Sequence, residues 1–461
     1  MLKRYIGDRV FYKKVIMVAL PIIIQNGITQ LVSLLDNVMV GAVGQIPMSG
    51  VAIANQLMFV FNICVFGATS GAGIFTAQFH GNRDHEGVRN TFRFKLLACL
   101  TVAVVGSAVF VLWGSPLLST YLQGEGDPAE AALTLAYGMD YLQIMLLGLL
   151  PFAITNAYNT TLRESGQTVM PMISGVAGVL TNLCLNWVLI FGHFGLPAMG
   201  VRGAAVATVI SRYVELAVTV IWTHTHGKAH PFIRGAYRSM RIPKTLLARI
   251  AKRGTPLMCN ELAWALGMAF LSQCYSYCSL AVVPATNITS VIRNLSAVVQ
   301  MAMGSAVGIL MGQLMGSGAG EEEVRSTNRK LLAISLTAGV VFGGLMAGVS
   351  SLFPQLYKVS SQVRTLAAQL ILIHAVIMPF NAYTHSIYFT LRSGGRTGIT
   401  FLFDSGYVCF VQVPLAFALT RFFSLGILPV YIVCQGAEMC KAFLGVAMLK
   451  KCKWIRNLAK E

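Results

Sequence analysis

The sequence predicts an all-α integral membrane protein whose twelve membrane-spanning helices form two parallel six-helix repeats. Hydrophobic residues make up 55% of the 461-residue chain and charged residues only 11%, whereas soluble domains carry roughly 25% charged residues. A mainly apolar segment of about 20 residues is long enough to cross a bilayer, and twelve such segments follow one another along the chain. A long internal repeat divides these segments into two sets of six.

The expected spans are separated by short loops that hold most of the charged residues. Prolines inside spans remove a backbone hydrogen bond and can kink a helix; examples are Pro21, Pro151, Pro256 and Pro379. In chain order, the spans lie approximately at 15–40, 50–79, 94–115, 133–158, 169–192, 201–223, 254–279, 284–313, 330–353, 366–391, 399–420 and 426–449.

The internal repeat is clearest where residues 67–98 recur as residues 302–333. Ser70, Gly73, Ile74, Gln78 and Gly81 recur at a single offset as Ser305, Gly308, Ile309, Gln313 and Gly316. A repeat this long indicates a duplicated half-protein rather than a solenoid, and duplicated helical halves are typical of secondary transporters. Each half has an even number of spans, so the two halves are expected to be parallel.

The charge distribution predicts the orientation and the division into domains. The net charge is +18, and 28 of the 35 lysines and arginines fall in the terminal segments, in alternate loops or in the first two residues of the adjoining spans, against four in or next to the opposite loops. Cytoplasmic loops carry such an excess, so both termini are expected in the cytoplasm and the charge is not evidence for nucleic-acid binding. The predicted domains are an amino-terminal lobe at 1–225, a basic cytoplasmic linker at 226–253 lying on lipid, and a carboxy-terminal lobe at 254–461.

Polar residues inside the first half mark a candidate cation-coupling site. Asp36 lies in the first span with no basic residue within a helical turn, and burying an ionised carboxylate costs roughly 2.5–3.5 kcal/mol on insertion scales. Asn182 and Asn186 share one face of the fifth span, and Thr208 lies at a similar depth in the sixth. Together these oxygens could hold a proton or a small hard cation; the alternative is a polar cluster that only joins three helices.

The second half contains another set of intramembrane polar residues, interpreted as a substrate cavity or a second coupling site. Glu261 and Asp404 lie at similar depths, and the long side chain of Arg293 could reach either acid. A static ion pair that reduces the burial cost of both partners is the alternative. Asn381 and His385 in the tenth span could line the same cavity.

Two further intramembrane acids have a basic neighbour three residues away. Arg212 precedes Glu215 and Lys441 follows Glu438 by one helical turn, the spacing at which side chains on a helix meet. We expect these pairs to neutralise each other and to anchor their helices.

Enzymatic chemistry is not indicated. The sequence has no His-Glu-x-x-His motif and no evident nucleophile–base pair. None of the ten cysteines belongs to a Cys-x-x-Cys pair, and His224, His226 and His230 are expected to be solvated in the linker region. The chain is therefore predicted to be neither an enzyme nor a holder of a metal or an organic cofactor.

Several spaced motifs resemble the multidrug and toxic compound extrusion (MATE) family. They are ALPIIIQNGITQLVSLLDNVMVGAVG in the first span, SGVAIANQ opening the second, TLRESGQT and TLRSGGRT ending the fourth and tenth, and GQLMGSGAG closing the eighth. The resemblance implies two six-helix lobes in a V around a central cavity. It also implies export of small organic compounds, often cationic, in exchange for protons or sodium.

The resemblance also implies roles for individual residues. Asp36 matches the first-span acid that many members use for cation coupling, and Asn182 and Thr208 resemble further members of that site. Many relatives have a second acid where this chain has Asn186, which puts sodium chelation in that lobe in doubt. Glu261 resembles an acid of some subgroups, whereas Asn381 stands near a position where others carry one.

Two other transporter classes remain as alternatives at this point. GNRDHEGVR after the second span resembles a loop of major facilitator transporters, although GSGAGEEEVR after the eighth lacks its spacing. A lipid-linked oligosaccharide flippase of the same superfamily is the other alternative. The working expectation is a monomeric antiporter of the cell membrane that exports small organic compounds, driven by H⁺ or Na⁺.

Overall fold

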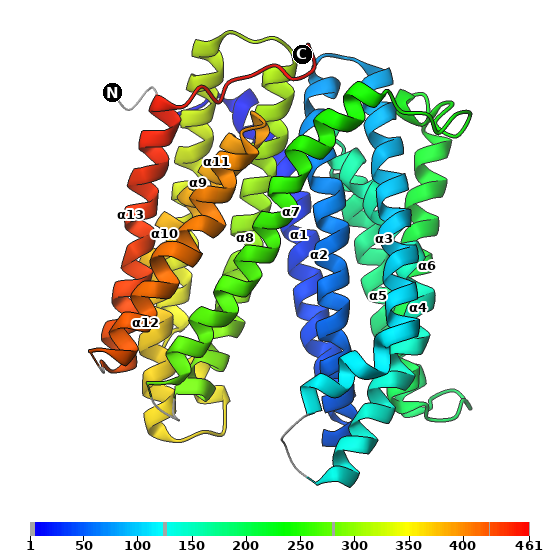
Figure 1. Ribbon diagram of the computed structural model, residues 1–461, viewed down its shortest axis with the longest axis vertical. Helices are drawn as coiled ribbons and strands as arrows, with labels where there is room; N and C mark the ends of the chain where they lie inside the picture. Colours follow the sequence, from blue (N-terminus) through cyan, green and yellow to red (C-terminus); the bar gives the residue numbers. More distant parts are fainter. Residues whose placement is uncertain (1–4, 123–126, 279–281, 424, 461) are drawn as a thin grey trace. The chain divides into compact units, whose positions relative to one another are not determined.

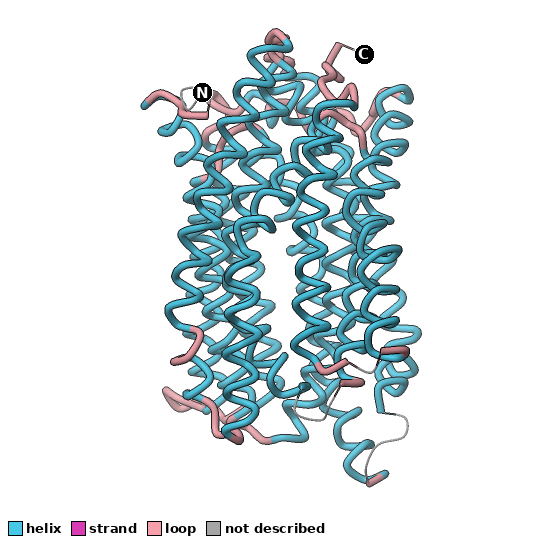
Figure 2. The backbone as a smooth tube through the Cα atoms, turned by 90° about the vertical axis from the view of Figure 1, so that its left-hand side faces the viewer, coloured by secondary structure: helices cyan, strands magenta, loops and turns pink. Residues whose placement is uncertain are grey.

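The computed structural model describes residues 5–122, 127–278, 282–423 and 425–460. Within these ranges the chain is all-helical, without a strand (Figures 1 and 2). The predicted span end at residue 279 and the outermost residues of both termini lie outside them. The α-helices are α1 (Arg9–Gly41), α2 (Gln45–Gly81), α3 (His85–Ser119), α4 (Pro128–Glu164), α5 (Val169–Phe191), α6 (Gly200–Thr225), α7 (Lys244–Ser276), α8 (Val282–Gly316), α9 (Glu321–Val349), α10 (Ser361–Ser393), α11 (Thr397–Phe401), α12 (Val413–Arg421) and α13 (Ile427–Lys451).

These helices confirm the predicted fold class. Eleven helical segments of the described residues are long and apolar enough to cross a membrane. One of them, Thr397–Arg421, joins α11 to α12 through the π-helical turns Leu402–Gly406 and Val408–Gln412. The remaining predicted span corresponds to the 33-residue α7, which is less apolar because Asn260 and Glu261 interrupt it. The chain is a multi-pass membrane protein.

The helices pack into two compact units whose boundaries differ from the predicted domain limits. Unit 1 comprises residues 1–23, 77–83 and 249–461, and unit 2 comprises residues 24–76 and 84–248. Helices α1 and α2 are therefore shared between the units. In unit 1, Val15, Val18 and Ile22 of α1 join one hydrophobic cluster with residues of α8, α9, α10 and α13. In unit 2, α6 packs against α4 and α5.

The repeated motif forms a close helix crossing inside unit 1. A Cβ atom added to Gly81 of α2 would stand 2.0 Å from the carbonyl oxygen of Gln313 of α8, and one added to Gly316 would stand 2.0 Å from the carbonyl oxygen of Gln78. The two copies of the motif thus pack on each other through equivalent residues. Small residues at a membrane helix interface allow this approach of two backbones.

The first part of the predicted linker folds against unit 2. Phe232 and Ile233 are buried, and Arg93 of α3 donates hydrogen bonds to the carbonyl oxygens of Gly235 and Ala236 at 2.9 and 2.8 Å. His224 is exposed, as expected, and its Nε2 lies 3.1 Å from the Tyr158 hydroxyl oxygen. Backbone carbonyls of the linker therefore satisfy the guanidinium of the buried Arg93, a role that the charge pattern does not reveal.

Candidate functional site

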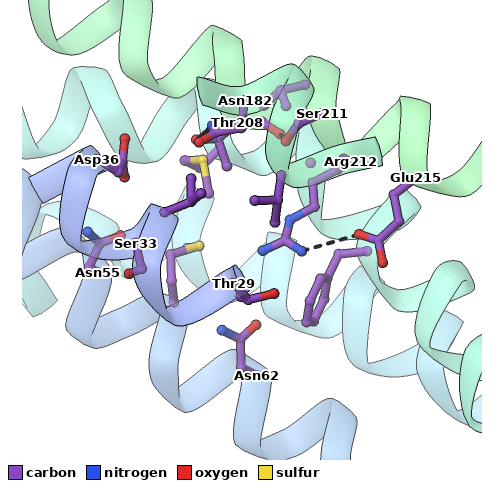
Figure 3. Close-up of a pocket in the computed structure, with 18 of the residues that line it drawn as sticks. Thr29, Ser33, Asp36, Asn55, Asn62, Asn182, Thr208, Ser211, Arg212 and Glu215 are labelled. Carbon is purple, nitrogen blue, oxygen red and sulfur yellow. Dashed lines mark hydrogen bonds and ion pairs between the residues drawn. The ribbon is translucent and has the colours of Figure 1, made fainter. Parts of the chain in front are cut away.

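A polar cavity of about 510 Å³ lies inside unit 2, between α1, α2, α4, α5 and α6 (Figure 3). Its volume is within the range of small-molecule sites, about 300–1,000 Å³. Apolar and aromatic side chains form much of its wall, including Met58, Phe59, Phe61, Met145 and Phe152. The polar side chains that line it are Thr29, Ser33, Asp36, Asn37, Asn55, Asn62, Tyr141, Asn182, Thr208, Ser211, Arg212 and Glu215.

The four residues of the predicted amino-terminal site form one continuous hydrogen-bond chain. Asn186 Nδ2 donates to Asp36 Oδ1 at 2.5 Å and to Asn182 Oδ1 at 3.2 Å. Asn182 Nδ2 donates to the Thr208 hydroxyl at 3.1 Å, and that hydroxyl donates to the carbonyl of Ala204. This series of hydrogen bonds therefore links Thr208 on α6, through the two asparagines on α5, to the Asp36 carboxylate on α1.

Asn186 donates hydrogen bonds to Asp36 and Asn182 but does not itself line the cavity. It is fully buried, and its amide nitrogen faces Asp36, so Asn186 is a donor here and not the oxygen ligand that the sequence suggested. Asn182 and Thr208 also use their oxygens as hydrogen-bond acceptors within the chain. The arrangement holds one face of the Asp36 carboxylate by hydrogen bonding and does not form an oxygen cage.

Asp36 is an acidic residue of the cavity wall that has no ionic partner in the described ranges. In the described part of the chain, no basic side chain forms an ion pair with it, although it is half-buried in a membrane-spanning helix. An intramembrane carboxylate without a fixed counter-ion is costly. A proton or a cation from the cavity would remove that cost.

Arg212 and Glu215 on α6 also line the cavity, a location that the sequence analysis missed. Arg212 Nη1 lies 3.7 Å from Glu215 Oε2, as the helical spacing predicted. The guanidinium lies 4.5 Å from the ring centre of Phe152, and Asn159 Nδ2 donates to Glu215 Oε1 at 3.3 Å. Figure 3 shows this pair and Asp36 as separate charged groups of the wall.

The spacing of the polar residues in α1 indicates which face of this helix lines the cavity. Thr29, Ser33 and Asp36 are spaced by four and three residues, so they share one helix face, and all three line the cavity. Asn55 and Asn62 of α2 are seven residues apart and also line it. Polar residues repeated at helical spacing within apolar spans therefore indicated the cavity face.

In unit 1, Asp404 does not pair with Arg293, the ion pair that the sequence left open as an alternative. Asp404 Oδ1 instead accepts a hydrogen bond from Lys441 Nζ of α13 at 3.0 Å, and Asp404 Oδ2 accepts one from Asn260 of α7 at 3.1 Å. Arg293 forms no ion pair with Glu261 or Asp404 among the described residues. The ion pair expected from spacing, Lys441 with Glu438, is present at 3.9 Å.

The other residues predicted for this site, Glu261, His385 and Asn381, each have different neighbours. Glu261 lies near the Asn260 amide, the Tyr388 hydroxyl and the positive charge of Arg392. His385 Nε2 lies 3.1 Å from the sulfur of Met301. The side-chain oxygen of Asn381 is buried without a hydrogen-bond partner in the described structure.

The comparisons with known proteins agree with this architecture. The family model described as MatE matches residues 21–188 and 256–418. The chain belongs to the MATE family. This membership favours a MATE transporter over a major facilitator protein.

Two bacterial relatives of the MATE family align with nearly the whole chain. A probable multidrug resistance protein NorM of Thermotoga maritima is 25% identical over 449 residues, covering 96% of this chain and 93% of that protein. A probable multidrug resistance protein YoeA of Bacillus subtilis is 24% identical over 425 residues, covering 89% of this chain and 88% of the relative. Both relatives thus share nearly the whole length of the chain, as expected for members of one transporter family.

Solved MATE structures share the fold. One described as the outward-facing conformation of a multidrug resistance MATE family transporter of the MOP superfamily superimposes with a TM-score of 0.86 at 19% identity, covering 97% of this chain and 96% of that one. A MOP superfamily transporter from Pyrococcus furiosus, whose binding pocket is described as having reverse polarity, gives a TM-score of 0.83 at 19% identity and covers 98% of both chains. At these identities the likeness establishes the fold alone.

Proposed function

We propose that this protein is a proton-coupled antiporter of the cell membrane that exports small organic cations by alternating access. The single observation that carries the proposal is the Asp36 carboxylate at the wall of the cavity, held by Asn186 and lacking an ionic partner among the described residues. Both termini are assigned to the cytoplasm because of the lysine and arginine distribution. The working unit is a monomer, with the lipid bilayer as its surroundings.

The charges of the cavity favour a cationic substrate. Asp36 and Glu215 contribute two negative charges and Arg212 one positive charge, so the described wall carries a net negative charge when all three are ionised. Phe59 and Phe61 also line the cavity, and aromatic rings have faces that attract cations. A desolvated organic cation of moderate size matches this combination of charge and apolar wall.

The hydrogen-bond geometry favours a proton over sodium as the coupling ion. Sodium would require several oxygen ligands, whereas Asn186 presents its nitrogen to Asp36 and the oxygens of Asn182 and Thr208 already accept hydrogen bonds. A proton needs only the free electron pairs of the carboxylate. The replacement of a second acid by Asn186 leads to the same preference.

Coupling follows from competition between the two cations. With Asp36 ionised, the cavity retains its net negative charge and binds the substrate. Protonation of Asp36 removes that charge and lowers the affinity for the substrate, and substrate binding opposes protonation by the same free energy. Proton entry can then drive substrate exit.

Reconstituted vesicles with independently imposed proton and sodium gradients test this proposal. We expect a fluorescent organic cation to be moved by a pH gradient at equal sodium on both sides, and not by a sodium gradient at equal pH. Transport driven by sodium alone would contradict the choice of coupling ion. Movement of a lipid-linked oligosaccharide, with no organic cation moved under either gradient, would favour the flippase alternative.

A further inference from the structure

A buried ammonium group lies between two carboxylates in unit 1. Lys441 Nζ is 3.0 Å from Asp404 Oδ1 and 3.9 Å from Glu438 Oε2, and its side chain is only 8% exposed. The rings of Phe403 and Tyr407 have their centres 5.4 and 5.9 Å from the same nitrogen. Two anionic groups and two aromatic faces thus surround one cation.

The two carboxylates are held in place from the side away from Lys441. Asn260, which is 1% exposed, donates to Asp404 Oδ2 at 3.1 Å and accepts on Oδ1 from the Ser405 hydroxyl at 2.7 Å. Gln412 donates to Glu438 Oε1 at 2.7 Å. Each acid therefore directs one oxygen toward a fixed donor and the other toward the ammonium.

The backbone that carries Asp404 is also unusual. Asp404 and Gln412 lie in the two π-helical turns between α11 and α12. Such turns interrupt an α-helix and occur frequently at functional sites. The interruption places Asp404 and Gln412 so that they contact Lys441 and Glu438 of α13, respectively.

We propose that Lys441 is a built-in cation that occupies a carboxylate site formed by Asp404 and Glu438 and thereby excludes Na⁺ from it. Removal of the ammonium leaves two adjacent carboxylates with fixed orientations and no positive charge between them. Oxygen ligands of this kind suit a small hard cation. Lys441 is thus a specificity-determining residue. Its ammonium is the counter-ion of Asp404, so Asp404 needs no sodium ion to balance its charge.

Thermal unfolding of the purified full-length protein tests the site without a transport assay, so its outcome is separate from that of the proposed function. The Tm of Lys441→Met is measured with increasing NaCl, choline chloride keeping the ionic strength constant. A ligand that binds only the folded state raises the Tm in a concentration-dependent manner. We expect the Tm of this variant to rise by at least about 2 °C with NaCl, and that of the wild type to remain unchanged.

Two controls identify the origin of the sodium effect. Lys450→Met makes the same substitution on an exposed residue of α13, and it should leave the protein insensitive to sodium. The double variant Lys441→Met with Asp404→Asn should lose the sodium response, because one of the two carboxylates is gone. A response that survives in the double variant would overturn the assignment of Asp404.

Failure of the single variant to fold would also be informative. If Lys441→Met is misfolded in choline chloride and recovers a cooperative transition in NaCl, sodium has replaced the ammonium. If Lys441→Met and Lys441→Gln are both misfolded in both salts, or both fold without a sodium response, the inference is overturned. A wild-type protein stabilised by sodium as strongly as Lys441→Met would overturn it as well.

Discussion

Gly81 of α2 approaches Gln313 of α8 so closely that an added Cβ atom would stand 2.0 Å from the Gln313 carbonyl oxygen. The reciprocal approach of Gly316 to Gln78 has the same distance. These are the residues in which the sequence repeat is clearest. The repeat is therefore conspicuous at this point because each copy packs on the other, which restricts both to small side chains.

Gly81→Ala should destabilise the protein through this crossing. A methyl group cannot share space with a backbone carbonyl, so α2 and α8 must separate, and overpacking of this kind costs about 1–3 kcal/mol. The matched control is Gly344→Ala in α9, where an added Cβ meets nothing within 4 Å and alanine should be neutral or favour the helix by about 0.5–1 kcal/mol. Thermal unfolding in detergent checks both changes. Equal Tm values for the two variants would show that the crossing is free to widen.

The membrane helices and the amino-terminal cluster could be predicted from sequence because their signals are local or strongly constrained. Apolar length identifies a span without knowledge of its neighbours. Asp36, Asn182 and Asn186 stood out because a buried polar group requires a partner, and few polar groups were available at that depth. The structure joins them in one hydrogen-bond chain.

The partners of the second-half charges could not be predicted in the same way. Lys441 was assigned to Glu438 because a spacing of three residues is visible in the sequence, and that ion pair exists at 3.9 Å. Its shorter contact, 3.0 Å to Asp404, depends on how the π-helical segment packs against α13. Helical periodicity identifies neighbours on one helix and carries no information about which helices pack together.

Loss of the Glu164 charge should unfold unit 2 more easily. Lys95 of α3 is fully buried and forms an ion pair with Glu164 of α4, with Thr161 Oγ1 at 3.2 Å as a further partner. Glu164→Gln leaves a buried ammonium without its counter-ion, which typically costs about 3–5 kcal/mol. The measured quantity is the Tm of the purified protein.

The exposed ion pair of Arg202 with Asp140 provides a control for this change. Its two partners have side chains that are 63% and 35% exposed, and solvent-exposed pairs contribute little to stability. Arg202→Gln should therefore leave the Tm nearly unchanged. A fall in Tm as large as that of Glu164→Gln would mean that burial does not distinguish the two pairs.

The orientation in the membrane can be tested by labelling single introduced cysteines. Met240→Cys lies in the basic linker and should be protected from an impermeant maleimide added to intact cells. Phe194→Cys lies in the loop after α5, where the native side chain is 84% exposed, and should react. The wild-type protein, which has ten native cysteines, gives the background. Labelling at 240 but not at 194 would reverse the proposed orientation.

Asp36→Asn separates the packing role of this residue from its charge. The amide is nearly isosteric and can still accept the Asn186 hydrogen bond, so the helices around the cavity should remain packed. Burial of an ionised carboxylate costs roughly 2.5–3.5 kcal/mol, so the Tm should be unchanged or higher. Export driven by a pH gradient should be largely lost, because an amide cannot alternate between charged and neutral forms.

Binding of the organic cation is the informative second measurement on this variant. The proposed competition predicts that substrate affinity falls with decreasing pH in the wild type. In Asp36→Asn the affinity should be low and no longer respond to Asp36 protonation, because the cavity lacks the exchangeable negative charge. Gradient-driven export at the wild-type rate would instead show that Asp36 only joins α1 to α5, and Glu261 would become the next acid to substitute.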